Sequence, residues 1–239
     1  MIKEAMQFLL SQAKQTEFHE KNGELYSNVN LSKIEEPTRN AISIQSLTGA
    51  VDFIKDNFDE DDKVLVTVLD EKRLKVQTVL NDNKYRETIL NVDADVPEKT
   101  LDRYMDLEKF NIQLQSQFVP TVDRANILQI IGNLRSENVK NLGDDGTTQI
   151  VEVKKGVTIA QDQAVPNPVY LKPFRTFTEI AQPESPFVFR LKQERDEVYA
   201  ALFEADGGAW RSEARISIKE YLTEQLQAEV KAGEVLIIG

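Results

Sequence analysis

Two different hydrophobic periods follow each other along this chain, and their order constrains the fold more than any single motif. Between residues 63 and 92 apolar side chains alternate with their neighbours, as Val64 and Val66 do, and this period of two is typical of strands with one buried face. Thr100–Phe118 and Thr121–Asn138 instead repeat apolar residues every three or four positions, which predicts two helices. The sequence therefore predicts an α+β fold in which a β-meander precedes a helical pair.

The remaining patterns extend this prediction toward both ends. Further helices are predicted over residues 2–13 and 48–58 and from Trp210 to a stop at Gly233, and strands over residues 24–29, 149–153, 157–160, 169–180, 187–192, 198–203 and 235–238. The later strands predict a C-terminal antiparallel sheet accompanied by a long helix. We expect residues 1–37 to form an N-terminal arm and residues 38–239 to form one α+β domain.

Composition excludes several kinds of chemistry. The chain has no cysteine, so disulfides, thiolate metal sites and thiol nucleophiles are excluded. Its formal charge of −11 repels phosphate backbones and disfavours non-specific nucleic-acid binding. No segment approaches the roughly 20 apolar residues of a membrane span, and the first residues lack the apolar core of a signal peptide. We expect a soluble cytoplasmic protein with no cofactor, no bound metal and no membrane partner.

The N-terminal arm carries a candidate contact surface. Met6, Leu9 and Leu10 fall on one face of the predicted first helix, and a polar stretch separates this helix from the next apolar pattern. A short amphipathic helix is marginal unless its apolar face is buried. The pattern therefore predicts a homo-oligomer in which Met6, Leu9 and Leu10 contact another copy, since symmetric assembly is the common form of self-association.

Catalytic motifs are weak. Asp145, Glu152 and Lys154 match the carboxylate and Glu-x-Lys arrangement by which many nucleases hold Mg²⁺, but their spacing is short and the motif recurs by chance. The run from Asp59 to Asp62 lacks the spacing and glycine of a calcium loop. His19 is the only histidine, and no nucleophile elbow or phosphate loop occurs. We therefore predict no enzyme, with a metal-dependent nuclease as an alternative.

A second alternative is binding of single-stranded nucleic acid. Lys172, Arg175 and Arg190 lie near several aromatic residues, among them Phe187 and Phe189, on predicted strands. Aromatic rings beside arginine can stack bases. The competing interpretation is that these rings fill the core behind the last helix, because large aromatic side chains usually supply core area.

Longer phrases of the sequence carry a family resemblance. They are Phe110–Phe118, Gly143–Gly146, Val165–Val169, Pro173–Glu179, Gln182–Phe187 and Ala201–Trp210. Together they resemble an uncharacterised family of proteins carried by phages and prophages of Gram-positive bacteria, and the order of elements is similar to YfdQ-type prophage proteins.

The resemblance implies a context and carries over no catalytic residue. It implies a viral gene product that acts in the bacterial cytoplasm, where such proteins handle DNA or bind host or phage proteins. The order of arm, meander, helix and sheet is also similar to that of viral capsid and encapsulin shell subunits. We therefore expect a non-enzymatic phage protein that self-assembles or binds a protein partner.

Overall fold

The chain divides into two compact units, Met1–Thr38 and Arg39–Gly239. The predicted boundary, after residue 37, differs from this division by one residue. The computed structural model describes residues 3–4, 6–8, 18–21, 24–27, 38–57, 59, 63–81, 84–136, 138–144, 149–155, 158–195 and 197–239.

The first unit contains a helical segment and a small hairpin. Residues 3–4 and 6–8 are helical, within the helix predicted over residues 2–13. Strands β1 (Phe18–Lys21) and β2 (Glu24–Ser27) pair antiparallel. Only the second of these strands was predicted, because the first has no alternation of apolar residues.

One half of the second unit is built on a mixed sheet of five strands, which come from both ends of that unit's sequence. Its order is β14-β4-β5-β6-β3. The strands are β3 (Ile42–Ile44), β4 (Val64–Val68), β5 (Arg73–Thr78), β6 (Thr88–Asp93) and β14 (Val235–Ile238). The strands β4, β5 and β6 pair antiparallel in sequence, which confirms the predicted meander, whereas β14 and β3 add to its edges in parallel.

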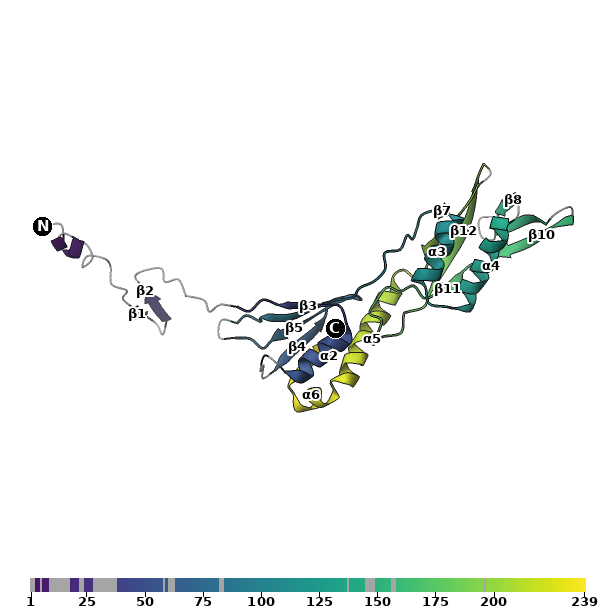
Figure 1. Cartoon of the computed structure of the whole chain (residues 1–239). Helices are drawn as coiled ribbons and strands as arrows, with labels where there is room; N and C mark the ends of the chain where they lie inside the picture. The colour runs from purple at the N-terminus through teal and green to yellow at the C-terminus, as the bar shows by residue number, and fades with distance from the viewer. Residues whose placement is uncertain are drawn as a thin grey trace. The chain divides into compact units, whose positions relative to one another are not determined.

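Three helices lie on one face of this sheet (Figure 1). They are α2 (Leu47–Asp56), α5 (Ala209–Gln225) and α6 (Gln227–Ala232). Helix α2 begins at Ser46, whose hydroxyl accepts a hydrogen bond from the Gly49 N–H at 3.1 Å. The alternate strand residues Val66, Val76 and Leu90 are fully buried against the helices, as one-sided burial of a period-two strand requires.

A second core is built from four antiparallel strands and two helices. The strands, in the order β11-β12-β13-β7, are β7 (Met105–Asp106), β11 (Val169–Leu171), β12 (Ser185–Glu194) and β13 (Glu197–Glu204). The helices α3 (Leu107–Gln117) and α4 (Val122–Ser136) pack on this sheet through Phe110, Leu114, Ile127 and Ile131. These four residues belong to the predicted stripes, and both helices are confirmed.

A separate three-stranded sheet follows α4. It contains β8 (Asn138–Asp144), β9 (Gln149–Lys155) and β10 (Thr158–Val165), and its β9–β10 hairpin confirms the predicted one. Gln149 joins this sheet to β12: its side-chain amide donates to the Leu191 carbonyl at 3.0 Å and accepts from the Leu191 N–H at 2.8 Å. Both backbone groups of Leu191 are thereby satisfied inside the protein.

Three of the predicted boundaries are wrong, and the first is that the single helix predicted from Trp210 to Gly233 is divided at Leu226 into α5 and α6. Helix α3 begins after Asp106, whose carboxylate accepts from the Lys109 N–H at 2.8 Å, and not at Thr100. Asp102 has a φ of 60°, a left-handed conformation that interrupts a right-handed helix. The strand predicted over residues 169–180 ends at Leu171, because Pro173 lacks the N–H that a strand ladder needs.

Within the described ranges, no helix combines the length and the apolar character needed to cross a membrane.

Candidate functional site

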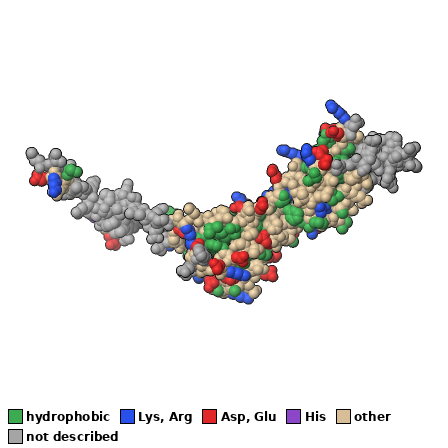
Figure 2. All heavy atoms as spheres, in the orientation of Figure 1, with side chains coloured by type: hydrophobic (Ala, Val, Ile, Leu, Met, Phe, Trp, Pro, Cys, Tyr) green, Lys and Arg blue, Asp and Glu red, His purple; other side chains and the backbone are tan. Residues whose placement is uncertain are grey.

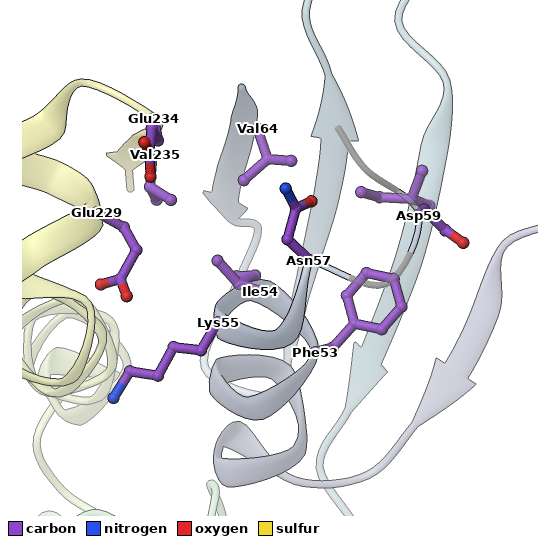
Figure 3. A pocket seen from close by; sticks show the side chains of 10 residues that line it. Phe53, Ile54, Lys55, Asn57, Asp59, Val64, Glu229, Glu234 and Val235 are labelled. Atoms are coloured by element: carbon purple, nitrogen blue, oxygen red, sulfur yellow. The ribbon is translucent and has the colours of Figure 1, made fainter. Parts of the chain in front are cut away.

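A cavity lies where the end of α2, α6 and the starts of β4 and β14 meet (Figure 3). Its volume is about 280 Å³. Apolar side chains such as Ile54 and Val64 form part of its wall. Helix α2 ends beside it at Asn57, which adopts a left-handed φ of 46° and directs the chain toward Asp59.

Carboxylates dominate the polar part of this cavity. Asp59, Glu229 and Glu234 line it together with Lys55. Arg39 pairs with Asp59 at 3.1 Å, whereas the buried Oε2 of Glu229 has no hydrogen-bond partner among the described residues. The side chains of Lys55 and Glu229 extend from α2 and α6 on the same side of the cavity (Figure 3). The cavity can therefore accept a hydrogen-bond donor or a cationic group.

The described lining of this cavity lacks the hydroxyl and thiol nucleophiles that many enzymes place beside a histidine base. No histidine, serine, threonine or cysteine occurs among the described residues that line the cavity. The described part of the chain also has no group of three or more histidine or acidic side chains arranged to hold a metal ion.

A second candidate site surrounds Arg175, in the segment between β11 and β12. Its side chain is 3% exposed and ion-pairs through Nη1 with Glu204 at 3.3 Å. Its Nη2 donates to the Pro183 carbonyl at 3.1 Å and to the Ser185 hydroxyl. The guanidinium carbon lies 4.0 Å from the centre of the Trp210 ring, within cation–π range. Arg175 therefore joins this segment to β13 and to the first turn of α5.

Gln182 gives the segment its shape. Its side-chain oxygen accepts from the N–H groups of Arg175 at 2.9 Å and Thr176 at 3.2 Å, and its amide donates to the Phe177 carbonyl at 2.9 Å. The hydroxyl of Thr176 donates to the Glu71 carbonyl, in the turn between β4 and β5. The Arg175 centre is therefore held by both halves of the second unit.

Burial changes the acid–base properties of two cations here. Burial lowers the pKa of Arg175 to about 10, against the opposing effect of Glu204 and other acidic side chains. Burial also lowers the pKa of Lys99 to about 8, and the charges of Lys72 and Arg175 add to this effect. A lysine with a lowered pKa is a functional-site candidate, although structural charge clusters produce such shifts too.

Replacing Lys99 by methionine is expected to stabilise the protein at pH 7. The folded-state pKa of about 8 lies below the unfolded value of 10.5, so the unfolded state binds more protons between these two values. Wild-type stability therefore rises with pH across this window, and the advantage of the variant shrinks there. We expect a gain of about 1 to 2 kcal/mol at pH 7, discounted for partial exposure.

Urea unfolding of both proteins between pH 7 and 10.5 measures this difference, and the other titrating groups cancel in the comparison. Lys109→Met is the matched control, because Lys109 is 78% exposed. A Lys99 variant that is less stable than wild type at pH 7 would contradict the prediction.

The structure describes the nuclease candidates only in part. Asp145 is outside them, and the structure gives Glu152 and Lys154 only as backbone positions in β9. In the ladder Glu152 pairs with Asp162 of β10 and Asn141 of β8. The nuclease alternative stays a prediction.

The candidates for nucleic-acid contact do not form one surface with the aromatic rings. Arg175 is buried against Trp210. The Nζ of Lys172 lies 3.9 Å from Oε1 of Glu184, and Arg190 is half-buried on β12. Phe187 and Phe189 are both 0% exposed, so their faces cannot stack bases. Figure 2 shows acidic and basic side chains interspersed on the visible face, without a continuous basic stripe.

The predicted oligomer contacts are only partly described. Met6 is 60% exposed, whereas Leu9 and Leu10 lie outside the described residues. Phe8, which lies off the predicted apolar stripe, is 63% exposed. The stripe criterion missed Phe8 because it selects one helical face only.

Comparison with known proteins adds no assignment to this geometry. No protein-family model, no curated protein and no solved structure matches the chain.

Proposed function

We propose that this chain is a non-enzymatic protein that self-assembles, and that its N-terminal unit contacts another copy. The observation that carries the proposal is the exposure of Met6 and Phe8, 60% and 63%, in a short helical segment of that unit. A helix of a few turns gains most of its stability from burying an apolar face. Exposed apolar side chains on such a segment are suited to a protein contact.

The described cavities support binding more than catalysis. The cavity beside α6 offers carboxylates and one lysine, and the Arg175 centre is enclosed by its own partners. Among the described residues, neither place brings a hydroxyl or thiol nucleophile beside a histidine base, a common arrangement in covalent catalysis.

The biological setting is part of the proposal. The family resemblance supports a phage or prophage protein that acts in the bacterial cytoplasm. The order of arm, meander, helical pair and second sheet supports a shell-like assembly similar to those of capsid and encapsulin subunits. In such a symmetric shell every copy makes the same set of contacts, so the arm of each copy can contact a neighbouring copy in the same way.

Replacing both Met6 and Phe8 by glutamate in the full chain is expected to weaken self-association. Fully burying a methionine or phenylalanine stabilises by about 1.5–3 kcal/mol, and a little over half of each side chain is exposed. The two together then contribute about 2 to 4 kcal/mol, or roughly 30- to 900-fold in the association constant. Sedimentation velocity across a concentration series measures this change.

The matched control replaces Ile112 and Val122 by glutamate, since these are 58% and 76% exposed on α3 and α4. The control is expected to keep the wild-type mass. Equal association constants for the Met6/Phe8 variant and wild type would show that the N-terminal unit makes no intermolecular contact.

A further inference from the structure

The strand β14 forms an unpaired edge of the five-stranded sheet. Among the described strands it is hydrogen-bonded only to β4. The Glu234 carbonyl accepts from the Val64 N–H at 2.8 Å, so this carbonyl points toward β4, whereas the Glu234 N–H donates to the Glu229 carbonyl at 3.0 Å. Because successive strand residues alternate in direction, the backbone N–H and C=O groups of Val235 and Ile237 point to the free edge.

This edge is short, at four residues, but it lacks other features that usually prevent strands from pairing between molecules. Besides shortness, proteins protect edges with charged residues, proline, bulges or covering elements. Val235–Ile238 contains neither charge nor proline, and its register with β4 is unbroken over all four residues. On the face of the sheet opposite the helices, Leu236 is 62% and Ile238 42% exposed. Leu236 lies beside Leu65 of β4, which widens this apolar area.

The helix layer has a groove near the end of β14. This groove of about 680 Å³ runs between α5 and α6 and reaches Gly239, the residue after β14. Ile216, which is 58% exposed, and Val230 contribute apolar surface to the groove. Some apolar side chains of both layers, strand and helix, are therefore exposed near the end of β14.

The charges around this edge favour a second copy as the occupant. The charged side chains that line the groove are two lysines, Lys219 and Lys231, and two glutamates, Glu220 and Glu224, whose formal charges sum to zero. The whole chain carries −11, which makes most approaches between copies repulsive. Because the positive and negative charges at this edge cancel, the same edges of two copies can approach each other without that repulsion.

We propose that two copies pair through antiparallel β14 strands across a twofold axis, so that two five-stranded sheets become continuous. The axis passes at Ile237, where the outward backbone groups of the two copies exchange hydrogen bonds. Leu236 then lies opposite Ile238 of the second copy, in the type of pair whose side chains come closest. An axis at Leu236 would instead place Glu234 opposite the apolar Ile238.

This inference rests on the proposed function, self-assembly, and identifies a second contact besides the N-terminal unit. Replacing Leu236 and Ile238 by lysine in the full chain places like charges opposite each other, so the twofold contact is lost. We expect the association constant to fall at least tenfold and the limiting mass to fall to about half. The corresponding double glutamate variant behaves alike, and an equimolar mixture of the two recovers the wild-type mass through opposite charges.

Cysteine cross-linking tests the register independently of the charged variants. The chain has no cysteine, so an introduced thiol reacts only with another introduced thiol. A mixture of Leu236→Cys and Ile238→Cys chains is expected to form a disulfide between the two variants under mild oxidation. Each single variant alone is expected to cross-link more slowly, because its thiols would lie diagonally, about 7–8 Å apart.

The possible outcomes distinguish failure of the β14 contact from failure of self-assembly as a whole. An oligomer that loses mass in the β14 variants but not in the Ile112→Lys, Val122→Lys control supports the edge contact. An oligomer of unchanged mass in the β14 variants, without preferential cross-linking between residues 236 and 238, overturns the edge contact and leaves self-assembly standing. A full chain that is monomeric without any substitution overturns both.

Discussion

Replacing Arg175 by methionine is expected to lower the free energy of unfolding by about 3 to 5 kcal/mol. The substitution removes the ion pair with Glu204, two hydrogen bonds from Nη2 and the contact with the Trp210 ring. The Pro183 carbonyl then loses its donor inside the protein, and an unsatisfied buried group costs its full desolvation free energy. Urea unfolding at pH 7, followed by circular dichroism, measures the loss.

Arg211 provides a matched control on the same ring. Its guanidinium carbon lies 5.4 Å from the Trp210 ring centre, but its side chain is 57% exposed and its ion pair with Glu71 spans 3.8 Å. Exposed pairs contribute little, so Arg211→Met is expected to cost less than about 1 kcal/mol. Arg175→Lys is expected to resemble Arg175→Met, because an ammonium cannot reproduce the planar fork of donors. Equal losses for Arg211→Met and Arg175→Met would contradict the importance assigned to burial.

Replacing Phe110 by alanine is expected to cost about 3 to 5 kcal/mol through the cavity it leaves. Phe110 of α3 is 0% exposed and stacks on Phe189 of β12 with ring centres 5.7 Å apart. The site joins a helix to the centre of the second sheet, so neighbouring elements can collapse only partly into the space. The same unfolding experiment measures this loss.

Ile112, on the same helix, is the control for Phe110. It is 58% exposed, so Ile112→Ala is expected to change the free energy of unfolding by no more than about 0.5 kcal/mol. A double-mutant cycle with Phe189→Ala is expected to give a coupling of about 0.5 to 1.5 kcal/mol for the stacked rings. Full additivity of the two substitutions would show that the rings do not interact beyond the area they bury.

Local periodicity was sufficient for most of the secondary structure. The stripe of Ile127, Ile130, Ile131 and Leu134 predicted α4, and all four side chains are buried. The terminal strand was predicted over residues 235–238, the bounds that β14 has. Such patterns succeed because burial of one face is decided by residues close in the sequence.

The predictions failed where distant groups replace local hydrogen bonds. Leu101 and its neighbours continue an apolar pattern, but the Asp102 N–H donates to the Leu202 carbonyl and the Thr100 backbone bonds the side chain of Gln113. After β11, the Phe174 N–H donates to the Gln117 carbonyl instead of extending the strand. These partners lie more than ten positions away in the sequence, so periodicity gives no sign of them.

The candidate sites were beyond sequence reasoning for the same reason. The basic candidates Lys172, Arg175 and Arg190 were selected by charge and by nearby aromatic residues, which do not reveal that Arg175 is enclosed by Glu204 and Trp210. Lys99 was not selected, since its lowered pKa arises from burial and from the distant charges of Lys72 and Arg175. The free edge of β14 depends on which strand pairs with it, and only the fold determines that.

Self-association is tested most directly by the mass of the full chain in solution. The mass is measured by sedimentation velocity at micromolar concentration and physiological ionic strength. At this ionic strength, salt screens the repulsion between copies that each carry a charge of −11. We expect a species whose mass is a multiple of 27.2 kDa, and a smaller multiple for the Met6/Phe8 glutamate variant at the same concentration. A single species of 27.2 kDa for the wild-type chain throughout the concentration series would contradict self-assembly.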